Sequence, residues 1–579
     1  MNWIERPFPQ PAYLALQQAG LTDLLARLLA ARGVRDANET DLALNQLLPP
    51  SDLKGIDAAA RLLGQAVADN LRICVVADYD CDGATACAVT LRGLRAMGAK
   101  QLSYVVPDRR VDGYGLTPGI AERVHAQGAD VLVTVDNGIA SVEGVQAARD
   151  LGLQVLVTDH HLPGAQLPAA HALVNPNQPG CTFASKHLAG VGVMFYVLLA
   201  TRAWLRDQGH FGSQGVPALD GLLPLVALGS VADVVTLDAN NRRLVHQGLE
   251  RVRKGRMPAG MAALFEVCGR DPRLCASLDF GFALAPRINA AGRMSTMGMG
   301  IECLLTDDPA TALRLARELD QVNRERRDVE SGMLEQALTL AHHRLTDQDG
   351  VACALSLFDP QFHEGVIGIV AGRLKDRHHR PTFVFAPAQS SPGHVKGSGR
   401  SIPGFHLRDA LDALSKRHPN LLLQFGGHAM AAGCTLRQAD LPMFGQALQQ
   451  LASEWLDPND LNHVWVTDGD LPLSAWNLPD FMALETQVWG SGFAPPLFCT
   501  EWRVAEQRLL GDKHLKLKLA RGHLEVDGIW FGRTELLPET ARLIYKPQIN
   551  RWRGNLQMQV QIEAMVESDS KASTLTITG

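Results

Sequence analysis

The sequence predicts an α/β protein: two α/β domains joined by a long helix, followed by a small antiparallel β-barrel. Continuous apolar runs alternate with helical segments between about residues 71 and 255, and again from residue 351. Such alternation is typical of parallel sheets that are covered on both faces. Beyond about residue 460, single apolar and polar residues alternate, which is typical of half-buried strands in a small barrel.

The individual elements follow from these patterns in chain order. The first fifty residues have leucines at helical spacing and end at Pro49-Pro50, so we expect a helical segment. In the first α/β domain we expect strands at 72–77, 102–106, 131–135 and 155–157, with a helix at about 84–97. A long polar-faced helix should cover 307–343. The second α/β domain should contain strands at 351–358 and 382–385, a helix at 368–374 and a glycine-rich turn at 396–399. Alternation at 514–519 and 557–561 predicts barrel strands.

These elements divide the chain into five segments: helical residues 1–50, a first α/β domain at 51–255, a helical connector at 256–345, a second α/β domain at 346–455 and a barrel at 460–570. The length of 579 residues fits three or four domains. The first ten residues contain no apolar core of a signal peptide, and no run of about 18 apolar residues occurs. The ten cysteines form no CxxC pair, which favours a reducing cytoplasm over a disulfide or zinc framework. The net charge of −6 requires any polyanion-binding surface to be local.

Acidic residues and histidines follow three predicted strands. The first strand leads into Asp78 and Asp80, the third into Asp136, and the fourth into Asp159-His160-His161. Ligands of open parallel sheets bind beyond the carboxyl ends of the strands, so these side chains should converge on one crevice. A further acid, Asp233, follows an apolar segment that could deliver it to the same place.

Clustered carboxylates repel one another unless a cation neutralises them. Oxygen ligands with one or two imidazoles suit Mg²⁺ or Mn²⁺. Two such ions about 3.5–4 Å apart, sharing one carboxylate, are the arrangement used for in-line phosphoryl displacement. Taken singly, an Asp-x-Asp after a strand is usually a turn or helix cap, and Asp-Asn-Gly is an ordinary turn. The occurrence of these motifs together, at successive strand ends, instead favours the metal site of a metal-dependent phosphoesterase.

Four motifs resemble those of the DHH phosphoesterase superfamily: DYDCDG (78–83), TVDNG (134–138), TDHH (158–161) and GSVAD (229–233). KGSGR (396–400) and FGGHAMAAG (425–433) resemble its companion DHHA1 domain. Together with VPDRRVDGYGL (106–116), PRINAAGRM (286–294) and the strand-rich tail, they resemble the family of single-strand-specific 5′→3′ exonucleases within it. The resemblance covers residues 20 to 565 and implies an OB-type barrel at the C-terminus.

This resemblance implies roles for the strand-end residues. One metal would be held by Asp80, Asp136, His160 and Asp233, and Asp136 would bridge to a second ion held mainly by Asp78. His161 would face the scissile phosphate as a catalytic residue, while Asp159 would orient the loop or a ligand. Related pyrophosphatases carry a histidine four residues before the first motif aspartate. This chain has Cys74 there, so the second metal should have fewer protein ligands.

The resemblance also implies a substrate-binding set of Arg109, Ser398, Arg400 and His428, in which Arg109, Ser398 and Arg400 would bind the DNA 5′-phosphate. A guanidinium with backbone N–H groups of a glycine-rich turn would make an anion nest. The alternatives are that Arg400 is a surface arginine and that Gly426-Gly427-His428 begins a helix. In the barrel, phosphate contacts and stacking faces are expected from Lys513, Lys516, Lys518, Tyr545, Lys546, Arg551, Trp552 and Arg553, although a solvated polar face would also explain these lysines.

We therefore expect a 5′→3′ exonuclease that degrades single-stranded DNA to mononucleotides by a two-metal mechanism, in recombination and repair. A short-oligonucleotide phosphodiesterase or pyrophosphatase of the same superfamily is the first alternative, and a non-catalytic DNA-binding scaffold is the second. The chain lacks GxxxxGK[ST], so no ATP use is expected. The partners implied by resemblance are a single-strand-binding protein and a helicase. We also expect a monomer without membrane contact.

Overall fold

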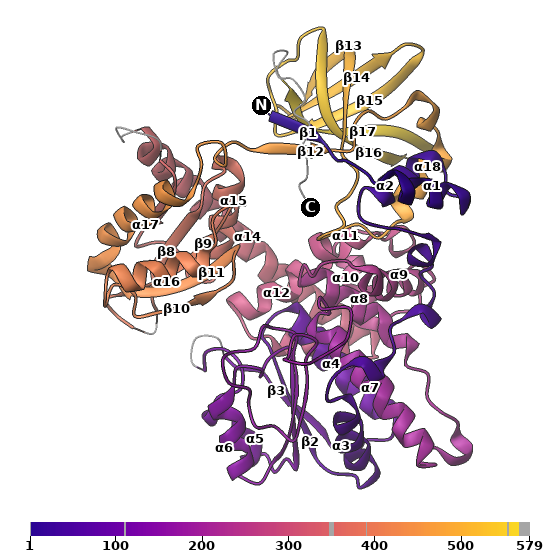
Figure 1. Ribbon diagram of the computed structural model, residues 1–579, viewed down its shortest axis with the longest axis vertical. Coiled ribbons are helices and arrows are strands. Elements are labelled where there is room, and N and C mark those ends of the chain that lie inside the picture. The colour runs from indigo at the N-terminus through magenta and orange to yellow at the C-terminus, as the bar shows by residue number, and fades with distance from the viewer. Residues whose placement is uncertain (1, 109–111, 347–351, 390, 553–554, 567–579) are drawn as a thin grey trace. The chain divides into compact units, whose positions relative to one another are not determined.

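The computed structural model describes residues 2–108, 112–346, 352–389, 391–552 and 555–566 (Figure 1). The chain divides into two compact units. Unit 1 consists of Met1–Asn289, Met297–Glu318 and Val464–Gly579, and unit 2 of Ala290–Thr296 and Leu319–His463. The predicted fold class is confirmed, because the described residues form two α/β sheets, a long helix and a closed barrel. None of the described helices is both long and apolar enough to cross a membrane.

The first α/β part of unit 1 is built on a five-stranded parallel sheet in the order β3-β2-β4-β5-β6. Its strands are β2 (Ile73–Ala77), β3 (Leu102–Val105), β4 (Val131–Val135), β5 (Gln154–Thr158) and β6 (Ala172–Val174). Helices cover both of its faces, with α5 and α6 on one side and α3 and α7 on the other (Figure 1). The surrounding helices are α3 (Ile56–Ala68), α4 (Cys81–Ala96), α5 (Pro118–Ala126), α6 (Val142–Asp150), α7 (Gly190–Asp207), α8 (Leu223–Ala232) and α9 (Ala239–Arg253).

The strand order places a switch point between β2 and β4. After β2 the chain adds β3 on one side and then β4 on the other, so the connections leave the sheet in opposite directions. Every residue of β2 and β4 is buried, which explains their continuously apolar sequences. Open α/β sheets bind ligands in the crevice at such a point, and here it lies beyond Ala77 and Val135.

The N-terminal segment differs from the helical prediction at its start. Residues of β1 (Asn2–Glu5) form a parallel two-stranded sheet with β12 (Val464–Thr467), ahead of the expected helices α1 (Gln10–Gln18) and α2 (Asp23–Ala30). A buried ion pair reinforces the link, because Arg32 Nη2 lies 2.8 Å from Asp468 Oδ2. The first residues are thus joined to the segment that leads into the barrel.

Between the two α/β sheets the chain is helical, as predicted. It forms α10 (Ala259–Val267), α11 (Ser277–Asp279), a π-helical turn (Phe280–Leu284), α12 (Ala285–Met294), α13 (Gly298–Leu305) and α14 (Pro309–Thr346). Helix α14 is 38 residues long and confirms the expected long helix.

Unit 2 contains a five-stranded sheet in the order β10-β11-β9-β8-β7, in which only β7 and β8 are parallel. Its elements are β7 (Leu355–Phe358), α15 (Ile367–His378), β8 (Thr382–Pro387), β9 (His394–Arg400), α16 (Leu407–Arg417), β10 (Gln424–Gly427), β11 (Ala431–Arg437) and α17 (Leu441–Trp455). The helix predicted at 368–374 and the strand at 382–385 are confirmed.

The glycine-rich turn predicted at 396–399 is wrong. These residues lie within β9, which pairs with β8 on one side and β11 on the other. Added Cβ atoms would come within 2.2 Å of the Phe385 ring at Gly397 and 2.5 Å of the Phe383 ring at Gly399. The glycines therefore make room for two core phenylalanines, and the backbone N–H groups are used in strand pairing rather than in an anion nest.

The C-terminal strands close a barrel in the order β13-β14-β15-β17-β16. The barrel is not wholly antiparallel as predicted, because β15 and β17 pair in parallel while the other neighbours are antiparallel. They are β13 (Phe498–Leu510), β14 (His514–Arg521), β15 (Leu524–Phe531), β16 (Thr540–Trp552) and β17 (Asn555–Val566), preceded by α18 (Leu478–Thr486). In β14 the leucines face inward and the lysines outward, as the alternation predicts.

Candidate metal centre

Asp78 and Asp80 occupy the turn between β2 and α4. Asp78 directly follows the last buried residue of β2, and its Oδ1 accepts a hydrogen bond from Tyr79 N at 2.8 Å. Asp80 is the N-cap of α4 and accepts from Gly83 N at 3.0 Å through Oδ1. One carboxylate oxygen from each of these two residues and from Asp136 lies within 4.8 Å of the others. The predicted convergence of the first and third strand ends is therefore observed.

Asp136 sits at the end of β4 in an unusual backbone conformation. Its φ of 63° is left-handed, a region that few residues other than glycine adopt. The neighbouring Asn137 is buried and donates through Nδ2 to Val76 O and Val135 O, which ties the end of β4 to β2. Gly190, at the start of α7, approaches so closely that an added Cβ would lie 2.5 Å from Asp136 Cβ. The surrounding structure thus over-determines the position of this carboxylate.

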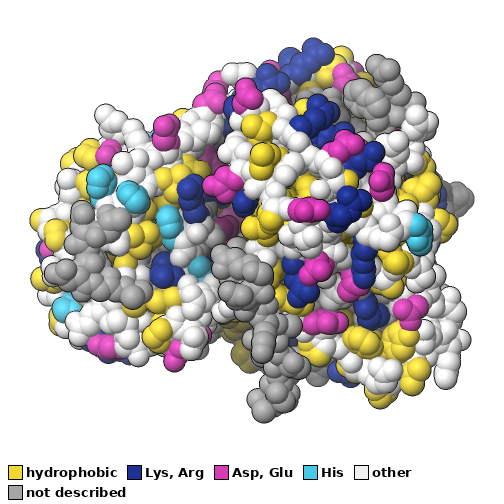
Figure 2. Space-filling view, turned by 90° about the horizontal axis from the view of Figure 1, so that it is seen from above, with side chains coloured by type: hydrophobic (Ala, Val, Ile, Leu, Met, Phe, Trp, Pro, Cys, Tyr) yellow, Lys and Arg dark blue, Asp and Glu magenta, His cyan; other side chains and the backbone are white. Residues whose placement is uncertain are grey.

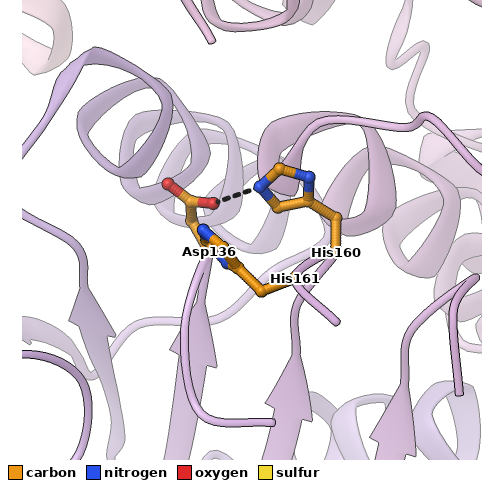
Figure 3. Close-up of side chains that lie close together, drawn as sticks. All are labelled: Asp136, His160 and His161. Carbon is orange, nitrogen blue, oxygen red and sulfur yellow. Dashed lines mark ion pairs between the residues drawn. The ribbon is translucent and has the colours of Figure 1, made fainter. Parts of the chain in front are cut away.

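His160 lies between two of the acids. Its Nε2 is 3.1 Å from Asp136 Oδ1 and 3.4 Å from Asp233 Oδ2. Figure 3 shows the His160 ring and the Asp136 carboxylate pointing toward each other beyond the ends of the strands. Asp233 is the C-cap of α8, so a helix rather than a strand delivers it. All five predicted metal ligands therefore gather at the switch point.

Asp159 and His161 form a pair beside this cluster. Asp159 Oδ1 accepts from His161 Nδ1 at 2.8 Å and from the backbone N–H groups of His160 and His161, while its Oδ2 accepts from Ile139 N. Protein donors thus occupy both oxygens, as expected for an orienting residue. Burial alone would lower the pKa of His161, but the hydrogen bond and charge of Asp159 raise it to about 9.

Three further residues belong to the site and were missed from the sequence. Asp82 is buried, accepts from Gly190 N and Val191 N at 2.6 and 2.9 Å, and offers an oxygen close to His160 and Asp233. The Tyr114 hydroxyl donates to Asp136 O at 3.3 Å and lies 3.3 Å from the His161 ring nitrogens. Asn137 is the third. Asp82 could have been found, because it stands in the same DYDCDG run as Asp78.

The two cysteines near the acids contribute no nucleophile. Burial, together with the charge of Asp80, holds the pKa of Cys81 well above its usual range, so the thiol stays neutral. Cys74 is buried inside β2 and occurs in none of the candidate metal groups formed by the described residues.

The predicted substrate-end residues lie in unit 2, except Arg109, which is outside the described residues. Ser398 and Arg400 project from the same face of β9, and Arg400 Nη1 donates to Ser398 Oγ at 3.2 Å and to Gly399 O at 2.8 Å. A Cβ added at Gly368, in the first turn of α15, would lie 2.8 Å from Ser398 Oγ and 3.0 Å from Arg400 Nη2. His428 is exposed in the turn between β10 and β11. The alternative that Gly426-Gly427-His428 begins a helix is therefore wrong.

The barrel departs from the expected contact surface. Tyr545 is fully buried, so it cannot stack on a base. Four expected phosphate-contacting side chains instead form ion pairs: Lys516 with Asp527, Lys518 with Glu525, Lys546 with Glu563 and Arg551 with Glu485. On the face seen in Figure 2, basic and acidic side chains are interspersed. Lys513 is exposed, while Arg553 and the side chain of Trp552 lie outside the described part of the chain.

Known protein families match both α/β domains and the barrel of this chain. The N-terminal domain model of the DHH family matches residues 72–230, the DHHA1 domain matches 349–454, and the RecJ OB domain matches 467–564. The single-stranded-DNA-specific exonuclease RecJ of Escherichia coli (strain K12) is 46% identical over 555 residues, covering 94% of this chain and 96% of that protein. The chain belongs to the RecJ family.

More distant RecJ proteins agree with this assignment. The Bacillus subtilis (strain 168) enzyme of the same name is 33% identical over 98% of this chain and 71% of its own length. A crystal structure of RecJ in complex with Mn²⁺ from Thermus thermophilus superposes with a TM-score of 0.81 at 30% identity, covering 99% of this chain and 81% of that one. The family therefore extends over the sheet units and the barrel alike.

The residues of the cluster fit a divalent cation. Burial, with the charges of neighbouring acids, holds the pKa values of Asp78, Asp136 and Asp233 well above their usual range and raises that of Asp82 to about 7. Asp136 Oδ1 is buried and accepts no hydrogen bond from the described residues. This oxygen faces an imidazole nitrogen and lies among acids that repel one another. A bound cation would offset that repulsion and stabilise the charged carboxylates.

We expect Mn²⁺ to raise the melting temperature more at about pH 8 than at about pH 6. The raised pKa values mean that the metal-free fold binds more protons than the unfolded chain, so its stability falls as pH rises. Metal binding must displace these protons and therefore strengthens with pH. Thermal unfolding of chelator-treated protein, with and without Mn²⁺, measures the difference at each pH. Asp233→Asn, which removes one ligand, should shrink the increment, and an increment that decreases toward high pH would contradict the assignment.

Proposed function

We propose that the chain is a single-stranded-DNA-specific 5′→3′ exonuclease that releases mononucleotides with two divalent ions, Mg²⁺ or Mn²⁺, in DNA recombination and repair. The observation that supports this proposal most strongly is that five side chains converge on one switch point: Asp78, Asp80, Asp136, His160 and Asp233. The chain that carries them is 46% identical to a RecJ exonuclease. When bound, the ions would activate a water and stabilise the leaving oxygen of an in-line displacement.

We assign roles to the chain's own residues on the contacts described above. Asp80, Asp136, His160 and Asp233 would hold one ion, and Asp78 with Asp136 the other. Asp159 accepts a hydrogen bond from His161 Nδ1, which fixes the orientation of the imidazole and raises its pKa. The imidazole would then be positively charged where it faces a phosphate. Tyr114 supports the same ring and the backbone of Asp136.

We assign the substrate end to unit 2. Ser398 and Arg400 lie beside the first turn of α15, and no side chain caps that helix start. A guanidinium, a hydroxyl and a helix N-terminus suit a 5′-phosphate. Arg109 and His428 complete the proposed set on resemblance. Residues 51–255 would thus be the catalytic domain, 346–455 the domain that holds the DNA end, and 460–570 a nucleic-acid-binding barrel.

A strand-polarity assay tests this function. Single-stranded and duplex DNA labelled at either end are digested with Mn²⁺ or Mg²⁺, alongside pApA and pyrophosphate. We expect mononucleotides to appear first from the 5′ end of single strands, with little digestion of duplex. Preference for pApA or pyrophosphate would instead support a short-oligonucleotide phosphodiesterase or pyrophosphatase, and DNA binding without hydrolysis would support a scaffold. We further propose a cytoplasmic monomer that acts beside a helicase and a single-strand-binding protein.

A further inference from the structure

The PRINAAGRM stretch forms α12, and none of its side chains has a role in the site described above. One of them nevertheless reaches the metal-bearing turn. Cys81 N donates to Asn289 Oδ1 at 2.8 Å, across 208 residues of sequence. Both residues belong to unit 1. Because the partner is an N–H donor, the oxygen of the amide must face it, which fixes the orientation of the side chain.

This hydrogen bond acts on the peptide that follows Asp80. The first N–H groups of a helix have no acceptor within the helix, and Cys81 is the first residue of α4. Asp80 satisfies Gly83 N with its own carboxylate, whereas Cys81 N depends on Asn289. The Asp80–Cys81 peptide is therefore held from outside the loop, and its orientation sets the direction in which the Asp80 side chain leaves the backbone.

An amide is suited to this position. The site already contains Asp78, Asp80, Asp82, Asp136 and Asp233, and burial and mutual repulsion raise the pKa values of four of them. A carboxylate at residue 289 would add a further negative charge, whereas asparagine accepts the same hydrogen bond without one. Residues that hold metal ligands in place through hydrogen bonds tune metal affinity, although they never touch the ion.

We propose that Asn289 is a positioning residue that holds the Asp78–Cys81 turn in its metal-binding geometry through the hydrogen bond from Cys81 N. The proposal rests on the metal site of the proposed function. It assigns to α12 a role in metal affinity in addition to its packing. A helix with a packing role alone would contribute to stability but leave the affinity for the ion unchanged.

Mn²⁺ titration of the full-length chain tests the proposal, with free Mn²⁺ followed by electron paramagnetic resonance and stability by thermal unfolding in chelator. Asn289→Ala should weaken Mn²⁺ binding by about 10–100-fold. Asn289→Asp keeps the acceptor, and its added charge burdens the metal-free fold but attracts the cation, so this variant should bind Mn²⁺ about as tightly as the original chain. Asn289→Ser, with a shorter polar side chain, replaces the alanine variant if that variant fails to fold, and should show the same loss.

Asn477→Ala is the matched control. Asn477 Oδ1 accepts from Asp480 N at 2.9 Å at the start of α18, the same kind of bond, and α18 packs against α2, β16 and β17. The Asn477→Ala variant should have a lower melting temperature and an unchanged affinity for Mn²⁺. Unchanged affinity in Asn289→Ala or Asn289→Ser would overturn the positioning role while leaving the proposed function intact. Failure of the original chain to bind Mn²⁺ would overturn the metal site itself, and this inference with it.

Discussion

Asp136→Asn should lower kcat on single-stranded DNA by about 10³-fold or more while the chain remains folded. The expected size follows because metal stabilisation of a phosphoryl transition state is worth several kcal/mol, and about 1.4 kcal/mol corresponds to tenfold in rate. Asparagine is the informative replacement because it tolerates the left-handed backbone that Asp136 adopts at φ 63°, whereas alanine would add strain. The substitution therefore removes the charge and keeps the turn.

Asp130→Asn is the matched control for this variant. Asp130 directly precedes β4 and Asp136 directly follows it, so the two aspartates stand about 20 Å apart at opposite ends of one strand. Asp130 forms an ion pair with Arg72, at 2.9 Å, and lies outside the cluster. Single-turnover assays should show near-normal hydrolysis for Asp130→Asn and loss for Asp136→Asn. Equal activity of both variants with Mn²⁺ would show that the ligand assignment is wrong.

The catalytic sheet and its cluster could be predicted because their information is local. Each of β2, β4 and β5 is a short apolar run that ends at an acid, and parallel pairing forces these ends to one edge of the sheet. The prediction of Asp78, Asp136 and His160 as neighbours needed only the strand boundaries. Asp159 was expected to orient the loop or a ligand, and the residue that it holds by a hydrogen bond is its near neighbour in the same loop, His161.

The glycines of β9 show where local patterns fail. Lys396-Gly397-Ser398-Gly399 has the composition of a turn, since glycine favours left-handed backbone. The reason for these glycines is instead the pair of rings at Phe383 and Phe385, which occupy the space of the missing Cβ atoms. Strand pairing on both sides is a non-local property, so no window of sequence around residue 397 contains it.

Long-range contacts explain the other differences. Strand β1 exists because β12, more than 450 residues later, offers it a partner, and the sequence of residues 2–5 alone does not indicate this. In the barrel, Lys516 and Lys518 were correctly placed outward by their alternation with leucine. Their pairing with Asp527 and Glu525 depends on the register between β14 and β15, which the lysine pattern does not contain.

Arg400→Ala should lower kcat/KM on 5′-phosphorylated single strands by about 10–100-fold, because charge-assisted hydrogen bonds contribute about 1.5–3 kcal/mol. Hydrolysis of the same strands with a 5′-hydroxyl should change far less, so the preference for the phosphate would be lost. Arg400→Lys, which keeps the charge without the planar fork, should be intermediate. Competition between differently labelled 5′-phosphorylated and 5′-hydroxyl strands measures the preference in a single reaction.

Arg437→Ala is the matched control, because the β9–β11 pairing places Arg437 far from Arg400. Arg437 lies opposite His394, whereas Arg400 lies opposite Ala431, so the two arginines stand at opposite ends of the strand pair. Arg437 forms an exposed ion pair with Asp440, a kind of contact that contributes little, and Arg437→Ala should leave the phosphate preference unchanged. If Arg400→Ala kept the full preference, the β9 side chains would not bind the 5′-phosphate. The polarity of digestion would then need another origin, because the strand's backbone N–H groups are already used in pairing.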